Sequence, residues 1–490
     1  MTSVLIKGAS MMRTTAATAA ALALALSAVV GVSADGEPGK TTVIPTFTKD
    51  VAPILYEKCA NCHRPGEIGP MSFLNYKSTR PWARSIRAMV ASREMPPWSA
   101  TSDSMKMRNN RTLSQDEIDT IGAWVEGGAP RGDDTHMPPV PEFPSGWQLA
   151  AHGEPDYIIE QPFEWTIKPE GSEPYLYFYQ KIPFAEDKWA RALELRPSNY
   201  AVVHHSGAYI VDIPEGYSVK DGYLYDEKGN QIPPSEPMGT KASSGDSDPL
   251  AGANKLLSYV PGRGYESHPE GFAKRIPAGK YIRWVLHYNP IGQIETDRSR
   301  LGLWFAKGPV SHEVLNLQAG SPVPGSGGRG LYFAQGKELR YEQGDEASRR
   351  AYRPAIPPYD ESFRMMGITP VNEDVTLYSL TPHMHLRGKS MKWWVTYPDG
   401  REKVILDVPN YDFNWQIQYE LETPLRIPAG SKITNVAIYD NSPNNRWNPA
   451  PEKPVYWAQQ SWDEMYQPTT QFSVDSQDLT KVSTQPATQE

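Results

Sequence analysis

The chain contains only two cysteines in 490 residues. At most one disulfide is possible, so stability must come from buried side chains, for which 14 Trp and 26 Tyr supply material. An excess of positive charge is also missing. Beyond residue 34 there are 47 basic and 57 acidic residues, a formal charge of −10, which argues against binding to nucleic acid or to an anionic membrane surface.

Long apolar runs are missing too, except near the N-terminus. Lys7 and Arg13 precede an Ala/Leu-rich stretch at 16–30, and small residues then end at Ala34. The stretch is shorter than the roughly 20 residues that a spanning helix needs, so a retained anchor is the less favoured alternative. The pattern predicts that residues 1–34 are a signal peptide cleaved near Ala34, with export to a periplasm and no stable membrane span afterwards.

Both cysteines lie in one short motif, Cys59-Ala60-Asn61-Cys62-His63. Two thiols at this spacing can add to the vinyl groups of haem, and the adjacent imidazole can bind its iron. A thioredoxin-like redox pair, half of a zinc site or a disulfide would not explain the histidine. The motif therefore predicts a covalently attached haem c, which in bacteria is assembled outside the cytoplasm.

Apolar side chains at helical spacing surround this motif. Residues 80–93 are a candidate helix, and Ser114 begins another with a capping box that Glu117 completes. With a helix just before the motif, this order is typical of a small cytochrome c. We therefore expect an all-α cytochrome c domain at residues 45–132.

A haem of this kind needs a second axial ligand, and the best candidate is Met95. It opens a Met-Pro-Pro-Trp segment, in which two prolines could hold a thioether rigidly over the iron. The alternatives are four other methionines of this region: Met71, Met89, Met105 and Met107.

The chain changes character after a Pro-rich linker at residues 133–147. Short runs rich in Val, Ile, Tyr and Trp then alternate with turn residues, and long helical patterns are absent. This predicts two all-β sandwich (jelly-roll-like) domains at residues 148–310 and 311–470, followed by a disordered tail at 471–490. The expected fold class is multidomain, with a small all-α cytochrome c domain ahead of both sandwiches. The clearest strand patterns are at 200–211, 281–288, 301–305 and 375–380.

Five of the nine histidines outside the haem motif fall in three short strand contexts. His383 and His385 are two apart, so on a strand they point to one face and can share a metal. His204 and His205 are adjacent, so sharing a metal requires a bulge or a strand end. His287 stands alone. A single histidine is more often structural, but imidazole-rich sites with a thioether suit copper better than zinc.

The order of these motifs, followed by the triplet Asp463-Glu464-Met465, resembles the copper type II, ascorbate-dependent monooxygenases. This family includes peptidylglycine α-hydroxylating monooxygenase and dopamine β-hydroxylase. The resemblance covers residues 150–470. Members with a fused cytochrome c domain would look much like the whole chain.

The resemblance implies two copper ions with three ligands each, which face each other across a solvent-filled gap. The electron-transfer copper, on the first sandwich, would be bound by His204, His205 and His287. The oxygen-binding copper, on the second sandwich where a substrate C–H bond is hydroxylated, would be bound by the catalytic residues His383, His385 and Met465.

Two positions depart from the peptide-amidating members. Thr381 stands where they anchor a substrate carboxylate with Arg, and Thr469 stands where they have Tyr. Animal members are also rich in disulfides, which this chain cannot be. Peptide amidation is therefore not expected, and the substrate class stays open.

The sequence as a whole predicts a periplasmic copper monooxygenase acting on a small organic substrate with O₂. Electrons would reach copper through the haem from an upstream periplasmic donor. The alternative is a non-catalytic haem and copper protein for electron transfer or redox sensing. A copper nitrite reductase is excluded, because its blue-copper centre needs a thiolate and both cysteines are assigned to haem.

Overall fold

The structure, a computed structural model, describes residues 43–144, 146–171, 174–235, 254–321, 323, 330–339 and 353–481. From Ile44 on, the chain forms one compact unit. The predicted signal peptide and residues 482–490 lie outside the described residues. Within the described ranges, no helix has the length and apolar character needed to cross a membrane.

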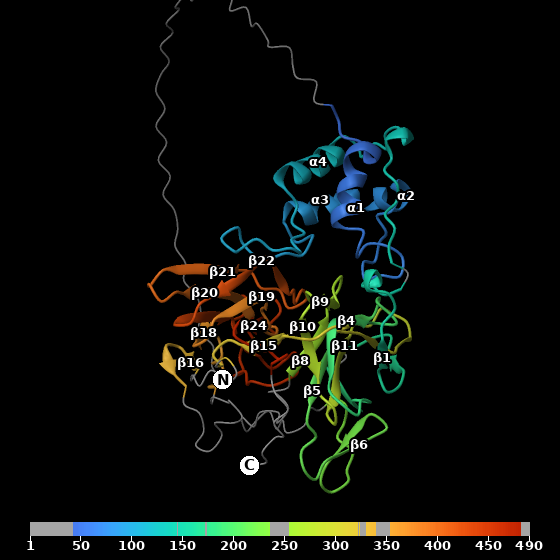
Figure 1. The fold of residues 1–490 in the computed structure, drawn as a ribbon. Helices are drawn as coiled ribbons and strands as arrows, with labels where there is room; N and C mark the ends of the chain where they lie inside the picture. The colour runs from blue at the N-terminus through green and yellow to red at the C-terminus, as the bar shows by residue number, and fades with distance from the viewer. Residues whose placement is uncertain are drawn as a thin grey trace, which may run out of the picture. The chain divides into compact units, whose positions relative to one another are not determined.

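Within the part of this unit that the structure describes, helices occur only in the N-terminal region (Figure 1). The predicted capping box is confirmed, because Glu117 N–H donates to Ser114 Oγ at 3.2 Å and Ser114 N–H donates to the Glu117 carboxylate at 2.7 Å. The helices pack around Phe47 and Trp124, whose rings lie 6.1 Å apart. Their bounds are η1 Phe47–Val51, α1 Ala52–Lys58, α2 Tyr76–Thr79, η2 Arg80–Trp82, α3 Ala83–Ala91, α4 Gln115–Glu126, η3 Asp134–His136 and η4 Ala150–His152.

The remaining described elements are strands. The first group comprises β1 Tyr157–Glu160, β2 Trp165–Ile167, β3 Leu176–Lys181, β4 Lys188–Arg196, β5 Val203–Val211, β6 Ser218–Lys220, β7 Tyr223–Tyr225, β8 Asn254–Tyr259, β9 Tyr265–Ser267, β10 Phe272–Ile276, β11 Tyr281–Tyr288, β12 Glu295–Asp297, β13 Arg300–Phe305 and β14 His312–Glu313. The second comprises β15 Leu315–Gln318, β16 Leu331–Ala334, β17 Lys337–Glu338, β18 Phe363–Val371, β19 Val375–Thr381, β20 Gly388–Thr396, β21 Glu402–Val408, β22 Tyr419–Ile427, β23 Ser431–Tyr439 and β24 Thr469–Val474.

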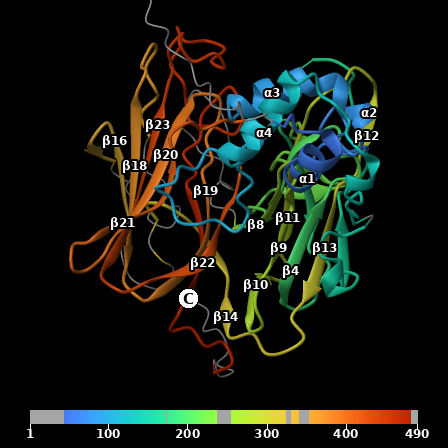
Figure 2. The same ribbon diagram turned by 90° about the horizontal axis from the view of Figure 1, so that it is seen from above.

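The strands form four larger sheets, which are antiparallel except where β14 pairs with β10. In the first group the orders are β1-β13-β4-β10-β14, with β9 on β4, and β3-β11-β5-β8. In the second they are β15-β24-β19-β22 and β17-β16-β18-β23-β20-β21, and Figure 2 shows β18, β23 and β20 side by side. Each group encloses an apolar core, one around the fully buried Trp284 and the other around the fully buried Trp393.

The expected fold class is wrong. Strands dominate one compact unit, and the helices do not make a separate all-α cytochrome c domain ahead of two sandwich domains. Even the longest helix among the described residues, α4, has only 12 residues. The chain between α3 and α4 joins the sheets, because Thr101 N–H donates to Asp407 O at 2.9 Å and Met107 pairs with Leu421. Helical periodicity reveals the helices but not that their connection packs into a β core.

The predicted strands agree with the structure better than the predicted start of the C-terminal tail does. The four clearest patterns are confirmed as β5, β11, β13 and β19. The tail, in contrast, was placed too early, because β24 is an inner strand between β15 and β19. Its polar Thr-Thr-Gln-Phe-Ser-Val sequence lacks the usual apolar alternation, which is why composition assigned residues 471–474 to a disordered tail.

A buried ionic cluster around Glu266 joins the two groups of strands. Its carboxylate accepts from Lys274 Nζ at 2.6 Å and from Gln471 Nε2, on β24, at 2.9 Å. Burial alone would raise the pKa of Glu266, but Lys274 and His268 outweigh it and lower this pKa to about 2. The carboxylate therefore stays ionised inside the molecule.

We expect Glu266→Ala to lower the free energy of unfolding by about 3–5 kcal/mol, because it leaves the Lys274 ammonium buried without its counter-charge. Adding Lys274→Met should restore part of the loss. Urea unfolding measures both. Asp399→Ala, which removes an exposed partner of Arg401, is the control and should leave the midpoint unchanged. If Glu266→Ala and Asp399→Ala unfolded at the same urea midpoint, this role of Glu266 would be contradicted.

Candidate metal centre

Three predicted copper ligands meet on the neighbouring strands β5 and β11. His205 pairs with His287 and Val203 with Tyr288, so His204 is the extra residue of a β-bulge. The bulge turns both adjacent imidazoles toward His287. One ligand atom from each ring lies within 4.8 Å of the others, so these histidines can bind one metal ion.

The other two histidines, His383 and His385, directly follow β19 instead of lying in it. Their rings are 5.2 Å apart and nearly perpendicular. Alternation along a strand is therefore not what brings their rings together; both lie in the irregular segment that follows β19.

One side chain connects the two histidine groups. Gln416 Oε1 lies 2.6 Å from His383 Nδ1, and Gln416 Nε2 lies 3.4 Å from His205 Nδ1. The five histidines therefore form one continuous cluster, the histidine cluster.

Aromatic rings complete the contact between the groups. Tyr175 stacks on His287, with ring centres 4.5 Å apart, and lies 6.2 Å from His385. Phe413 presents its edge at 5.8 Å to both His205 and His385. Side chains, and not the solvent-filled gap that the resemblance implied, lie between the groups.

Hydrogen bonds outside the cluster orient its rings. His383 Nδ1 bonds to Gln416, which leaves its Nε2 for a metal, and His385 Nδ1 lies 3.3 Å from Asp463 O. In His204 the other ring nitrogen is anchored, because its Nε2 lies 3.2 Å from Asn414 O. Neutral imidazole with one ring nitrogen anchored is the form that binds metal.

Burial keeps four of these five imidazoles neutral. It lowers the pKa of His204, lowers that of His383 to about 4, and lowers those of His205 and His385 well below their ordinary value. His205 Nε2 is buried and has no hydrogen-bond partner within the described structure. Because the Gln416 amide nitrogen donates to His205 Nδ1, the neutral ring carries its proton on Nε2, which must lose that proton before a metal can bind there.

The Asp-Glu-Met triplet is tied to the second histidine group through Glu464. Its carboxylate accepts from the backbone N–H groups of His385 at 2.9 Å and Arg387 at 2.6 Å, and from Met465 N–H at 3.2 Å. Burial raises the pKa of Glu464 to about 7, although these donors oppose the rise. Tyr439 OH donates to Met465 O at 2.8 Å. Met465 is thus fixed near the group, and its thioether ligation stays a prediction.

The haem motif forms a tight turn after α1. Cys62 N–H and His63 N–H both donate to Cys59 O, at 3.1 and 2.9 Å. Both thiols are free, and burial raises their pKa values, that of Cys59 to about 12. His63 stacks on Phe73 at 4.4 Å, and its buried Nδ1 has no hydrogen-bond partner within the described structure. Covalent attachment of haem at this motif stays a prediction.

The structure narrows the choice of the second axial ligand. Met105 and Met107 pack into the core around Trp393, so these two thioethers are not available to a haem. Met95 is half-buried just after α3, and its N–H donates to Met89 O at 3.2 Å. Met95 stays the predicted ligand.

Comparison with known proteins adds no assignment. No family model matches the chain, and no curated protein matches it. Similar solved structures include allantoicase, with 9% identity over 56% of this chain and 81% of that one and a TM-score of 0.16. Another is the VP2 subviral particle of infectious bursal disease virus, with 11% identity over 65% and 71% and a TM-score of 0.14. A third is the CBM22-1-CBM22-2 tandem domain of Paenibacillus barcinonensis Xyn10C, with 8% identity over 61% and 78% and a TM-score of 0.14. Scores this low carry no argument.

The lowered pKa of His383 predicts how stability depends on pH. Below its ordinary pKa of 6.5 the unfolded chain takes up a proton that the folded site refuses down to about pH 4. Stability of the metal-free protein is therefore complete above pH 6.5 and falls as the pH drops toward 4, by about 2–3 kcal/mol from this group.

Urea unfolding between pH 7 and 4 measures the effect. His383→Gln should flatten the decline, whereas the matched change at the exposed His136 should follow the wild type. Parallel curves for all three proteins would show that His383 is not held neutral.

Proposed function

We propose that the chain is a periplasmic copper monooxygenase that hydroxylates a C–H bond of a small organic substrate, with electrons supplied through a covalently attached haem. The observation that carries the proposal is the buried histidine cluster, in which two groups of neutral imidazoles stand side by side. Its ring nitrogens are anchored by Gln416, which lies between the two groups, and by the carbonyl oxygens of Asp463 and Asn414. Purely structural histidines would not need two such groups.

Copper bound here would supply one-electron redox chemistry and the activation of O₂. The reaction converts R–H and O₂, with two electrons and two protons, into R–OH and water. The chain's own part is to hold the imidazoles neutral and in fixed orientation, through Gln416 and the Glu464 carboxylate. Tyr175 and Phe413 exclude water between the two groups.

The two sequence positions that depart from the amidating enzymes lie next to each other. Thr381 and Thr469 are opposite each other in the β19–β24 ladder. Both positions thus bring short neutral side chains where the resemblance would have an Arg and a Tyr. We therefore propose a substrate that carries no carboxylate anchor.

The packing between the two histidine groups supports a second candidate function. Tyr175, Phe413 and Gln416 fill the space between the histidine groups, as suits electron transfer through a packed interior. The alternative is therefore a non-catalytic haem and copper protein for electron transfer or redox sensing.

Metal analysis tests the two groups separately. Wild-type protein loaded with copper and desalted should retain two copper ions per chain beyond the haem iron. His204→Ala and His383→Ala should each lose one, because each removes a ligand from a different group, and His136→Ala should lose none. Zinc in place of copper, or a single copper in the wild type, would rule out the two-copper assignment.

Single-turnover oxygen reaction tests the activity. Prereduced protein should consume O₂ with matching hydroxylated product only when an organic substrate is added, from a panel of amines, sulfur compounds and hydrocarbons. Met465→His should cut product by at least about tenfold, because a thioether favours the Cu(I) state that meets O₂. Its first copper should stay bound. Substrate-independent reoxidation in wild type and variant alike would favour the electron-transfer alternative.

A further inference from the structure

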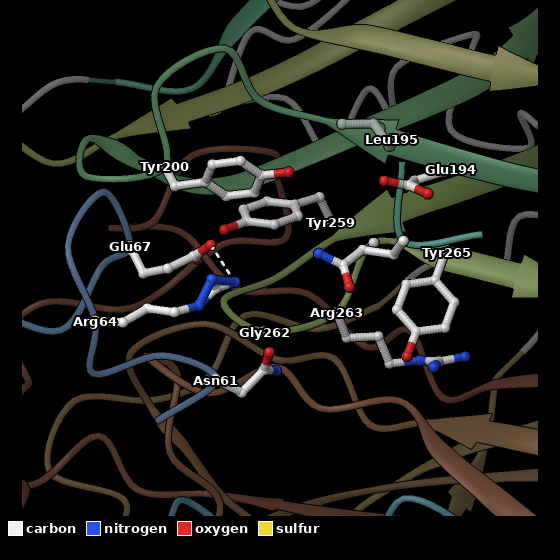
Figure 3. Close-up of a pocket in the computed structure, with 12 residues that line it drawn as sticks. Asn61, Arg64, Glu67, Glu194, Leu195, Tyr200, Tyr259, Gly262, Arg263 and Tyr265 are labelled. Carbon is white, nitrogen blue, oxygen red and sulfur yellow. Dashed lines mark hydrogen bonds and ion pairs between the residues drawn. The ribbon is translucent and has the colours of Figure 1, made fainter. Parts of the chain in front are cut away.

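A cavity of about 80 Å³ lies between the loop at residues 59–67 and the first group of strands (Figure 3). Arg64 and Glu67 line it from the loop, and Glu194 of β4 and Tyr259 of β8 line it from the opposite side. None of the predicted haem or copper ligands is among its lining residues. The cavity therefore offers a binding surface of its own.

Buried polar atoms around this cavity lack hydrogen bonds. Tyr259 is 3% exposed and Glu194 is 1% exposed, yet the Tyr259 hydroxyl and Glu194 Oε1 have no hydrogen-bond partner among the described residues. The same holds for the Nε atoms of Arg64 and Arg263, whose side chains are 10% and 12% exposed. Folded proteins contain few such atoms, because an unpaired buried group is costly. Four around one cavity indicate that its contents supply the missing bonds.

The charges around the cavity balance one another. Arg64 forms a 2.7 Å ion pair with Glu67, and Arg263 forms an ion pair with Glu420. The Glu194 carboxylate has the Arg196 guanidinium 4.0 Å away. Each cation therefore already has a carboxylate beside it, so a charged ligand would find no free counter-charge in the cavity.

We propose that this cavity binds a small neutral polyol. A hydroxyl group both donates and accepts, so one molecule can accept from the two arginine Nε–H groups and donate to Glu194 Oε1. At about 80 Å³ the cavity has room for roughly five to eight water molecules. A polyol of about three or four carbons has a similar number of non-hydrogen atoms.

Two aromatic rings favour a polyol over water alone. Tyr200 and Tyr259 both line the cavity, and their ring centres lie 5.7 Å apart in an edge-to-face arrangement (Figure 3). A tyrosine ring combines an apolar face with a polar hydroxyl. The carbon skeleton of a polyol can pack on such faces while its hydroxyl groups satisfy the polar atoms.

A ligand in this position joins two parts of the molecule. Arg64 belongs to the loop that follows α1, whereas Glu194 belongs to β4. A polyol that bonds to both side chains therefore fastens the loop to the sheet. This role is independent of the proposed copper chemistry.

Saturation-transfer NMR on the full-length exported protein tests the proposal, with erythritol as the probe. The wild type should transfer saturation to erythritol and give a titration that saturates. Tyr259→Phe keeps the ring and removes the hydroxyl, so it should raise the Kd for erythritol at least about fivefold. Tyr157→Phe removes a hydroxyl from a ring that is 40% exposed and lies outside the cavity, so it should keep the wild-type Kd.

A second variant tests the acceptor side of the cavity. Glu194→Gln places an NH₂ donor where the ligand has to donate, and it should also raise the Kd at least about fivefold. This variant decides the question even if Tyr259→Phe does not accumulate.

Three results would overturn the proposal. Absence of an erythritol signal in the wild type would show that the cavity holds water only. Binding of acetate in place of erythritol would show that the site takes anions. Equal Kd values for the wild type, Tyr259→Phe and Glu194→Gln would show that erythritol binds elsewhere.

Discussion

Burial keeps the imidazoles at the centre of the molecule neutral, and hydrogen bonds with neighbouring groups orient their rings. Five histidines come together there from three separate segments. Their partners are loop groups such as Asn414 O and Asp463 O, and the side chain of Gln416. Strands β5 and β11 place the first histidine group, and the segment after β19 places the second.

The sequence was informative wherever local chemistry decides the outcome. The adjacent His204 and His205 required a bulge to share a metal, and β5 has that bulge. Ser114 and Glu117 form the capping box that their spacing indicates. Such features depend on a few neighbouring residues, so a single sequence suffices to predict them.

Sequence reasoning failed where distant packing decides. Gln416, Tyr175 and Phe413 lie in segments without periodicity, so no pattern indicated that they would separate two histidine groups. Glu464 was noticed only as a neighbour of Met465, although its carboxylate holds the His385 backbone. The all-α domain was wrong for the same reason, because Trp98 leaves the helices to pack 4.9 Å from Tyr419.

The Gln416 amide lies between the two histidine groups. One end contacts a histidine of the first group and the other end a histidine of the second. Because the amide is rigid and planar, a rotation that changes its contact with His205 must also change its bond to His383. The orientation of a ring in one histidine group is therefore coupled to the orientation of a ring in the other.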